Sequence, residues 1–135
     1  MKKLMSLFCV SLICLFCGCN DDMKVRETIT YTVNKPVYMS ADVFRSSVKV
    51  TTQPEEITQK GKICFYEGYL YVSEPGKGIH IIDNRNPSSP ASVGFIELMG
   101  NADLAIRNNL LYADSYVDLV WFDISNPALP ALKNR

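Results

Sequence analysis

The chain has 135 residues, a length typical of one small domain. It carries fourteen basic and fourteen acidic side chains, so it lacks the excess positive charge with which proteins attract nucleic-acid phosphates, and this argues against a DNA or RNA partner. With 47% apolar and 21% charged residues, the composition is that of a folded rather than a disordered chain.

The first eighteen residues have the pattern of a secretory signal peptide. Lys2 and Lys3 precede an uncharged run, residues 4–18, that is shorter than the roughly 20 apolar residues of a membrane-spanning helix. The run ends on the small residue Gly18. This order of features predicts export, with removal of residues 1–18.

The segment from Leu15 to Cys19 resembles the lipobox of bacterial lipoproteins, in which a small residue precedes the cut and a cysteine follows it. The resemblance implies that Cys19 is lipidated and anchors the mature protein, as an outer-membrane lipoprotein, through its acyl chains. The alternative is an ordinary cysteine behind a signal peptide without lipid. In the first reading the mature domain keeps only Cys64 as a free thiol, so we expect no disulfide within it.

A short acidic segment follows the predicted lipid anchor. Asn20, Asp21 and Asp22 are similar to the tag that directs some Gram-negative lipoproteins to the cell surface, which implies possible surface exposure. The alternative is a solvated acidic linker. Residues 19–35 are polar and charged, and we interpret them as a tether between lipid and domain.

An N-terminal extension over residues 36–60 comes next. Ser40 is placed to cap a short helix near residues 41–48, and Asp42 would lie favourably in its first turn. Beyond it, short segments rich in Ile, Val, Tyr and Phe alternate with turn residues and no helical pattern, which predicts an antiparallel all-β meander. The predicted strands cover residues 62–67, 69–73, 78–83, 92–98, 103–107, 110–113 and 118–124.

The meander repeats itself after about 40 residues. Residues 83–90 align with residues 123–130, so that one Asp, one Asn and two Pro fall in register. A repeated aspartate before an Asn-Pro turn is expected to accept backbone hydrogen bonds rather than to catalyse a reaction. A period near 40 with four short strands is typical of a β-propeller blade. The repeat turn motif comprises Asp83, Asn86, Pro87, Pro90, Asp123, Asn126, Pro127 and Pro130.

The two copies resemble the LVIVD repeat of bacterial surface and secreted propeller proteins. The segments that carry the resemblance are Gly-Ile-His-Ile-Ile-Asp at 78–83 and Asp-Leu-Val-Trp-Phe-Asp-Ile-Ser-Asn-Pro at 118–127. The resemblance extends over residues 61–130 and implies fold and location more than chemistry. We therefore expect an all-β partial β-propeller within residues 61–135, of about one and three-quarter four-stranded blades.

Two repeats are few for this architecture, because propellers close with about four to eight blades and isolated repeats leave apolar faces exposed to solvent. The third strand of each copy is apolar on both faces, which predicts a cover on both sides. We expect Ile82, Val120 and Phe122 to lack a neighbouring sheet on one side. The sequence thus favours a truncated form of a longer propeller, or a short protein that self-associates through exposed sheet edges.

Few residues are candidates for chemistry. His80 is the one histidine, and its place on an apolar strand predicts a core residue; Cys64 is likewise expected to be a small buried hydrophobe. Asp103, Asp114 and Asp118 lack the spacing of a calcium loop. We therefore predict no catalytic residue, no metal and no cofactor.

The resulting functional hypothesis is a lipid-anchored, exported propeller protein that acts as a non-catalytic binding or scaffold module. Its partners would be the membrane, through the lipid, and an unidentified protein or glycan. Aromatic side chains could stack on sugars, although core packing is the simpler role for most of them. The alternatives are a fragment of a surface hydrolase or lyase that acts on glycan or peptide, with catalytic residues on missing blades, and a decayed copy without function. The aromatic residues considered are Tyr66, Tyr69, Tyr71, Tyr112, Tyr116 and Trp121.

Overall fold

The computed structural model describes residues 30–135. The predicted signal peptide, the anchor Cys19 and the tag Asn20, Asp21 and Asp22 lie outside the described residues. Residues 30–36 form no helix or strand and are exposed, whereas residues Val37–Arg135 form one compact unit. No helix in the described residues is both long and apolar enough to cross a membrane.

The compact unit starts with the short helix that the sequence predicts. Helix α2 spans Ala41–Ser46, and the Ser40 side chain accepts a hydrogen bond from the Val43 backbone N–H at 3.3 Å. This N-cap satisfies one of the backbone donors that a helix leaves free at its start. The helix stops before residue 48 because strand β1 begins at Lys49.

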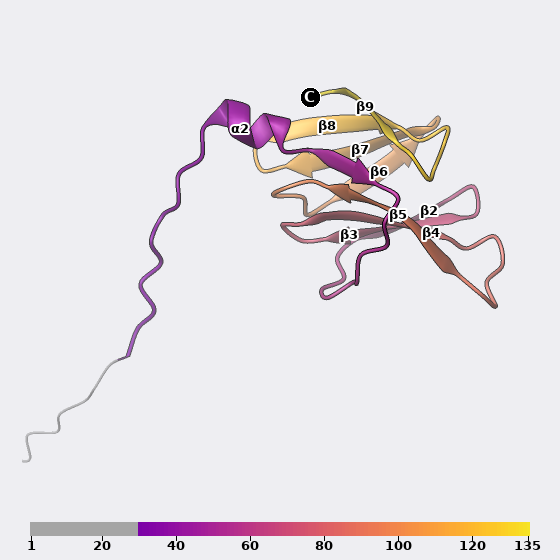
Figure 1. The fold of residues 1–135 in the computed structure, drawn as a ribbon, viewed down its shortest axis with the longest axis horizontal. Helices are drawn as coiled ribbons and strands as arrows, with labels where there is room; N and C mark the ends of the chain where they lie inside the picture. The colour runs from indigo at the N-terminus through magenta and orange to yellow at the C-terminus, as the bar shows by residue number, and fades with distance from the viewer. Residues whose placement is uncertain (1–29) are drawn as a thin grey trace, which may run out of the picture. The chain divides into compact units, whose positions relative to one another are not determined.

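The rest of the described chain is antiparallel β-structure in two sheets (Figure 1). The first sheet has the strand order β1-β5-β4-β3-β2, and the second has the order β6-β7-β8-β9. Sequential strands pair within each repeat, so each sheet is a meander, and the all-β class and the partial-propeller interpretation are confirmed. The strands are β1 (Lys49–Thr51), β2 (Ile63–Tyr66), β3 (Tyr69–Glu74), β4 (Gly78–Asp83), β5 (Ala91–Glu97), β6 (Leu104–Arg107), β7 (Leu110–Ser115), β8 (Asp118–Asp123) and β9 (Ala131–Asn134).

Two of these strands are additions to the predicted set. Strand β9 completes the second sheet with a fourth strand, so the predicted three strands there were one too few. All four of its residues are exposed, and without an apolar alternation it gives no signal in the sequence. Strand β1 is a fifth strand of the first sheet and pairs with β5, Val50 opposite Ile96. Both strands form because the neighbouring strand offers an unpaired backbone edge.

Matching two-residue turns open both repeats. Glu67 and Gly68 join β2 to β3 with φ of 47° and 82°, and Asn108 and Asn109 join β6 to β7 with φ of 51° and 59°. Positive φ at both central residues is the geometry of a type I′ turn, whose twist matches that of the flanking strands. These turns therefore set the same hairpin register in both sheets.

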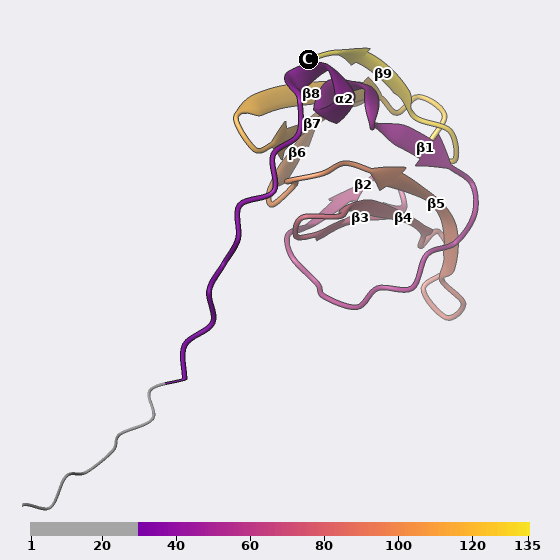
Figure 2. The ribbon, with the colours of Figure 1, turned by 60° about the vertical axis from the view of Figure 1, so that its left-hand side comes forward.

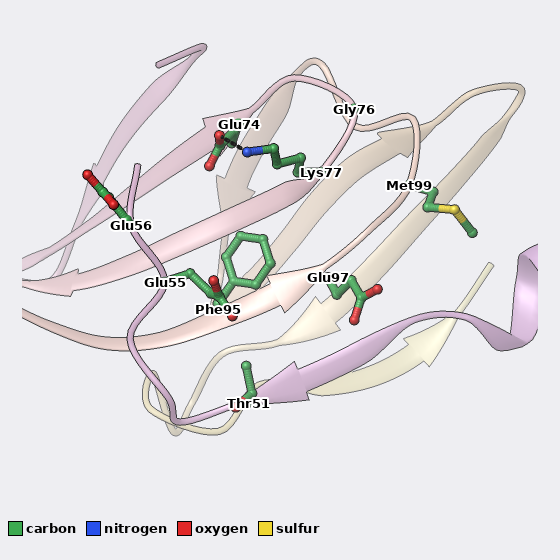
Figure 3. Close-up of a pocket in the computed structure, with 9 residues that line it drawn as sticks. All are labelled: Thr51, Glu55, Glu56, Glu74, Gly76, Lys77, Phe95, Glu97 and Met99. Atoms are coloured by element: carbon green, nitrogen blue, oxygen red, sulfur yellow. Dashed lines mark hydrogen bonds and ion pairs between the residues drawn. The ribbon is translucent and has the colours of Figure 1, made fainter. Parts of the chain in front are cut away.

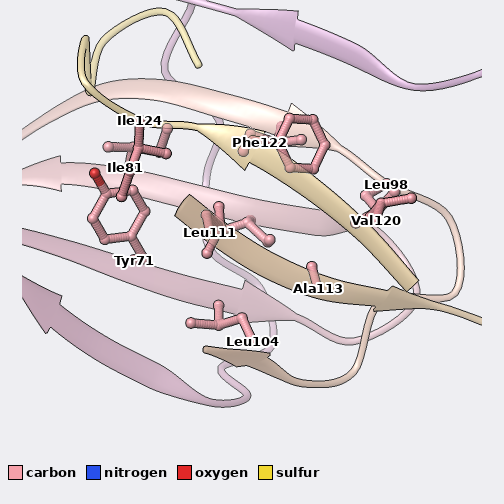
Figure 4. Packing of buried hydrophobic residues seen from close by; sticks show 11 residues of the cluster. Tyr71, Ile81, Leu98, Leu104, Leu111, Ala113, Val120, Phe122 and Ile124 are labelled. Carbon is pink, nitrogen blue, oxygen red and sulfur yellow. The ribbon is translucent and has the colours of Figure 1, made fainter. Parts of the chain in front are cut away.

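The two sheets pack face to face, and the hydrophobic core lies between them (Figures 2 and 4). Val120 and Phe122 are fully buried in this core, so the expectation that they lack a neighbouring sheet is wrong: their strand face points to the first sheet. Ile82, on the far face of the first sheet, is half-buried. The core residues are Tyr71, Ile79, Ile81, Ile96, Leu98, Leu104, Leu111, Ala113, Val120, Phe122 and Ile124.

The prediction of a cover on both sides of the third strand fails for β8. Leu119 points away from the core and is 56% exposed, and Trp121 on the same face is half-buried. The apolar sequence of β8 thus marks a face that no sheet of the described chain covers.

Candidate binding surface

Each sheet has an inner face, toward the other sheet, and an outer face. Strand alternation assigns the side chains: Tyr112 lies opposite Ala105 on one side and Trp121 on the other, and all three belong to the outer face of the second sheet. Leu119, two residues before Trp121, lies on that face as well. We call Ala105, Tyr112, Leu119 and Trp121 the second-sheet outer face.

This face combines aromatic and aliphatic surface. The rings of Tyr112 and Trp121 lie 6.5 Å apart between centroids and are tilted by 36°. Both are half-buried, whereas Ala105 and Leu119 are exposed. A hollow of about 250 Å³ runs along the face, and its lining includes Tyr112 and Leu119. Such a surface can pack against a sugar ring or against an apolar protein surface.

A larger hollow, of about 450 Å³, lies over the outer face of the first sheet (Figure 3). Phe95 lines it, and Glu55 and Glu56 come from the loop between β1 and β2. Glu74, at the end of β3, also lines it, although only 1% of this residue is exposed. A charge buried so deeply needs several partners.

The partners of Glu74 come from the loop between β1 and β2, from the turn between β3 and β4, and from β4. Its Oε1 atom accepts hydrogen bonds from the backbone N–H groups of Thr58, at 3.3 Å, and Gln59, at 3.2 Å, and from the Thr58 hydroxyl. Lys77 Nζ lies 2.7 Å from the same oxygen, and His80 Nε2 lies 2.7 Å from Oε2. The bond from Lys77, then those from Thr58 and His80, hold the pKa of Glu74 well below its usual range. The ionised carboxylate therefore accepts, and His80 Nε2 donates.

This arrangement leaves His80 unsuited to catalysis. The residue is 1% exposed, and its ring packs on Phe95 at 4.6 Å between centroids. A general base must reach a substrate proton within hydrogen-bond distance, which this burial prevents. The Glu74 cluster instead fastens the loop around Thr58 onto the first sheet. Sequence reasoning missed Glu74 because the second repeat has Ser115 at the matching position, so no repeated motif marks it; the available signal was an acidic residue at the end of a hydrophobic strand.

The repeated aspartates shape turns at matching places. Asp83 Oδ1 accepts a hydrogen bond from the backbone N–H of Arg85, and Asp123 Oδ1 accepts one from that of Ser125, both at 3.0 Å. The side-chain bonds from Arg85 lower the pKa of Asp83 to about 2, and the backbone N–H of Ser125, with Lys133 beside it, lowers the pKa of Asp123 to about 2. These carboxylates are engaged in local structure.

The remaining motif positions lie in the two loops that join β4 to β5 and β8 to β9. The backbone carbonyl of Asn86 accepts from Ser89 N–H at 3.0 Å, and that of Asn126 accepts from Leu129 N–H at 3.1 Å. Only in the first loop does the asparagine side chain also accept, from Ser88 N–H at 3.2 Å. The prolines of the motif, which cannot donate a backbone hydrogen bond, occupy the same loops: Pro87, Pro90, Pro127 and Pro130.

The three aspartates considered for calcium serve different partners. Asp114 Oδ1 accepts from the backbone N–H of Asp103, at 2.9 Å, and Asp103 pairs with Lys62 at 3.2 Å. Asp118 pairs with Arg45 at 3.0 Å. In the part of the chain that the structure describes, no three His, Cys, Asp or Glu side chains gather as metal ligands.

The other sequence candidates divide between core and surface. Cys64 is half-buried rather than buried, with Sγ 3.8 Å from the Leu104 carbonyl across the two sheets. Tyr71 is fully buried, which excludes it from sugar stacking, and Tyr116 is 71% exposed beside Phe44. Tyr112 and Trp121 pair on the second-sheet outer face.

Comparison with known protein families identifies both repeats. A family model described as LVIVD repeat matches residues 61–97 and residues 100–135, which correspond to strands β2–β5 and β6–β9. Searches of the curated proteins and of the solved structures found no match.

Proposed function

Because the chain belongs to the LVIVD repeat family, we propose that it is an exported, lipid-anchored protein whose two propeller-type blades form a non-catalytic binding or scaffold module. The observation that carries the proposal is the second-sheet outer face, where Tyr112, Trp121 and Leu119 form an apolar surface with no sheet of the described chain against it. Large apolar patches of this kind mark interaction sites.

The state of the polar side chains supports a binding role over a catalytic one. His80 is buried and bonded to Glu74, and Asp83 and Asp123 are held in turns. Each of these side chains is bonded to a neighbour within the fold, His80 through its Nε2 atom. A catalytic group instead has to be poised toward a bound substrate.

A fluorescence titration tests the proposed face directly, because Trp121 is the only tryptophan in the chain. Cellohexaose, mannohexaose and chitohexaose serve as glycan probes. We expect one of them to change the emission of Trp121. We expect Tyr112→Ala to weaken that binding roughly two- to tenfold, since an aromatic stacking contact contributes about 0.5–1.5 kcal/mol.

Tyr38→Ala is the matched control, because Tyr38 is 89% exposed and lies outside the face; its affinity should equal that of the unchanged protein. Equal loss in both variants, or no response to any probe, would contradict a glycan site here. Release of shorter sugars during the titration would favour the alternative, a hydrolase or lyase.

The anchor is tested separately through Cys19. In the proposed protein Cys19→Ala abolishes incorporation of labelled fatty acid and moves the chain from the membrane fraction to the soluble one. A Cys64→Ala variant, which leaves the lipobox unchanged, should stay in the membrane fraction. Retention of the Cys19 variant there would overturn the anchor.

A surface-exposure assay addresses the tag. Intact cells treated with an added protease should lose the unchanged protein, whereas Asp21→Asn with Asp22→Asn should protect it inside the cell envelope. Equal cleavage of both proteins would mean that the acidic segment is only a linker.

A further inference from the structure

The two sheets are copies of one repeat, but they pack through non-equivalent faces. From the first sheet the packing uses the face that carries Tyr71, Ile79 and Ile81, and from the second sheet it uses the face that carries Leu111 and Phe122. Equivalent positions follow from the repeat spacing. A residue of β2 or β3 corresponds to the residue 41 positions later, and a residue of β4 corresponds to the residue 40 positions later. The interface is therefore head-to-tail at the level of the repeats.

The second-sheet outer face is the repeat equivalent of the inner face of the first sheet. Its side chains match the first-sheet residues in apolar or aromatic character as well as in place: Tyr112 takes the place of another tyrosine, whereas Trp121 takes the place of an aliphatic residue. The equivalent pairs are Ala105 with Cys64, Tyr112 with Tyr71, Leu119 with Ile79, and Trp121 with Ile81.

The outer face of the first sheet is, in turn, the equivalent of the inner face of the second. Ile63 and Phe65 on β2 are 54% and 65% exposed, and Leu70 and Ile82 beside them are half-buried. We call these four residues the first-sheet outer face. The equivalent pairs are Ile63 with Leu104, Phe65 with Ile106, Leu70 with Leu111, and Ile82 with Phe122.

We propose that the second-sheet outer face of one copy packs on the first-sheet outer face of another, so that the contact between the two blades inside the chain is repeated between chains. The inference rests on the proposed binding role and names the partner as a second copy of this chain. Each copy brings both halves of the contact and contributes two blades. Closure at the usual four to eight blades corresponds to two to four copies.

The loop around Thr58 decides which part of the first sheet is available. It is fastened by Glu74 over His80 and Phe95, which are 1% and 7% exposed, and that half of the face is already covered. The open half lies on β2, and inside the chain β2 lies beside β6. The contact is therefore centred on β2 of one copy and β6 of the next, with Phe65 and Ala105 at its middle.

Two variants and their mixture test the head-to-tail geometry. Phe65→Lys introduces a charge into the first-sheet outer face, and Ala105→Lys introduces one into the second-sheet outer face. Both side chains are exposed, so neither change disturbs the core. Sedimentation of the full-length chain in density-matched detergent measures the mass. We expect an oligomer for the unchanged protein, a monomer for each variant alone, and a dimer for the mixture, because each variant retains the half that the other has lost.

Ala131→Lys is the matched control, since Ala131 is an exposed alanine on the outermost strand β9; this variant should remain oligomeric. A monomeric unchanged protein at every concentration overturns the inference, as do oligomers of either variant alone or a mixture that stays monomeric. A monomer that still binds an oligosaccharide at Trp121 leaves the proposed function standing and removes only the second copy as partner.

Discussion

At the scale of single residues, the clearest constraint is the absence of a side chain at Gly78. A Cβ atom built there would lie 1.9 Å from the Ile96 carbonyl oxygen, and the backbone has φ of 155°. Strands β4 and β5 pair at this point, Gly78 opposite Glu97. The second repeat has Asp118 at the same position, because the register of β8 and β9 begins only at Trp121 and leaves room for a side chain.

We predict that Gly78→Ala destabilises the fold by about 3 kcal/mol or more, since the methyl group forces β5 away from β4. Gly76→Ala is the matched control: it has a positive φ of 81°, but its Cβ would meet nothing within 4 Å. Its cost should be only ~1 kcal/mol, the conformational penalty alone. Urea unfolding of the two variants measures the difference, and equal losses would rule out the steric cause.

A second residue carries strain that can be relieved. Glu67 adopts φ of 47° in the type I′ turn, a conformation that asparagine tolerates better than glutamate. We predict that Glu67→Asn raises the free energy of unfolding by roughly 0.5–1 kcal/mol and so raises the melting temperature. Calorimetry measures the shift, and a lower melting temperature would show that the glutamate side chain makes a contact that outweighs the strain.

At the scale of elements, the loops after β4 and β8 depend on ionised aspartates. The pKa of both Asp83 and Asp123 is lowered to about 2 in the folded protein, against about 3.9 for a free aspartate. A depressed folded pKa contributes stability that is fully present above the unfolded pKa. That contribution is lost as the pH falls through the folded value.

The melting temperature should therefore fall as the pH is lowered from about 4 to about 2. Asp123→Asn should lower the melting temperature at neutral pH. It should also make the fall within that window less steep, because asparagine does not ionise and the variant has no carboxylate at this position whose pKa differs between the folded and unfolded chains. Thermal unfolding followed by circular dichroism over this range provides the comparison. An unchanged slope in the variant would mean that other carboxylates dominate acid unfolding.

At the scale of the whole compact unit, one short segment ties both sheets together. Strand β1 belongs to the first sheet, whereas α2 contacts the second: Arg45 pairs with Asp118 at 3.0 Å, and the Phe44 ring lies 5.5 Å from that of Tyr116. Arg135 pairs with the same Asp118 at 3.1 Å, and its guanidinium lies 4.8 Å from the Phe44 ring centroid. The segment acts as a strap across the pair of blades.

We predict that Asp118→Asn releases this strap without unfolding the sheets. Amide hydrogen exchange should become several-fold faster in residues 40–47 and remain unchanged in β3 and β4. Lys49→Gln is the control, because the pair of Lys49 with Glu97 is long, at 3.7 Å, and both side chains are largely exposed. Uniformly faster exchange throughout the sheets would mean that Asp118 supports the core rather than the strap.

By itself the sequence determined the all-β class, the short helix after Ser40 and the two repeats, because strand alternation, capping and turn residues act over a few positions. Only the tertiary structure showed that β9 and β1 join the sheets, since their pairing comes from a neighbour's free edge, and that Glu74 fastens the loop over His80. It also decided which apolar face is covered: β8 is apolar on both sides, yet Val120 is buried and Leu119 is exposed. Burial depends on which surface lies opposite a strand, and a one-dimensional pattern does not contain that information.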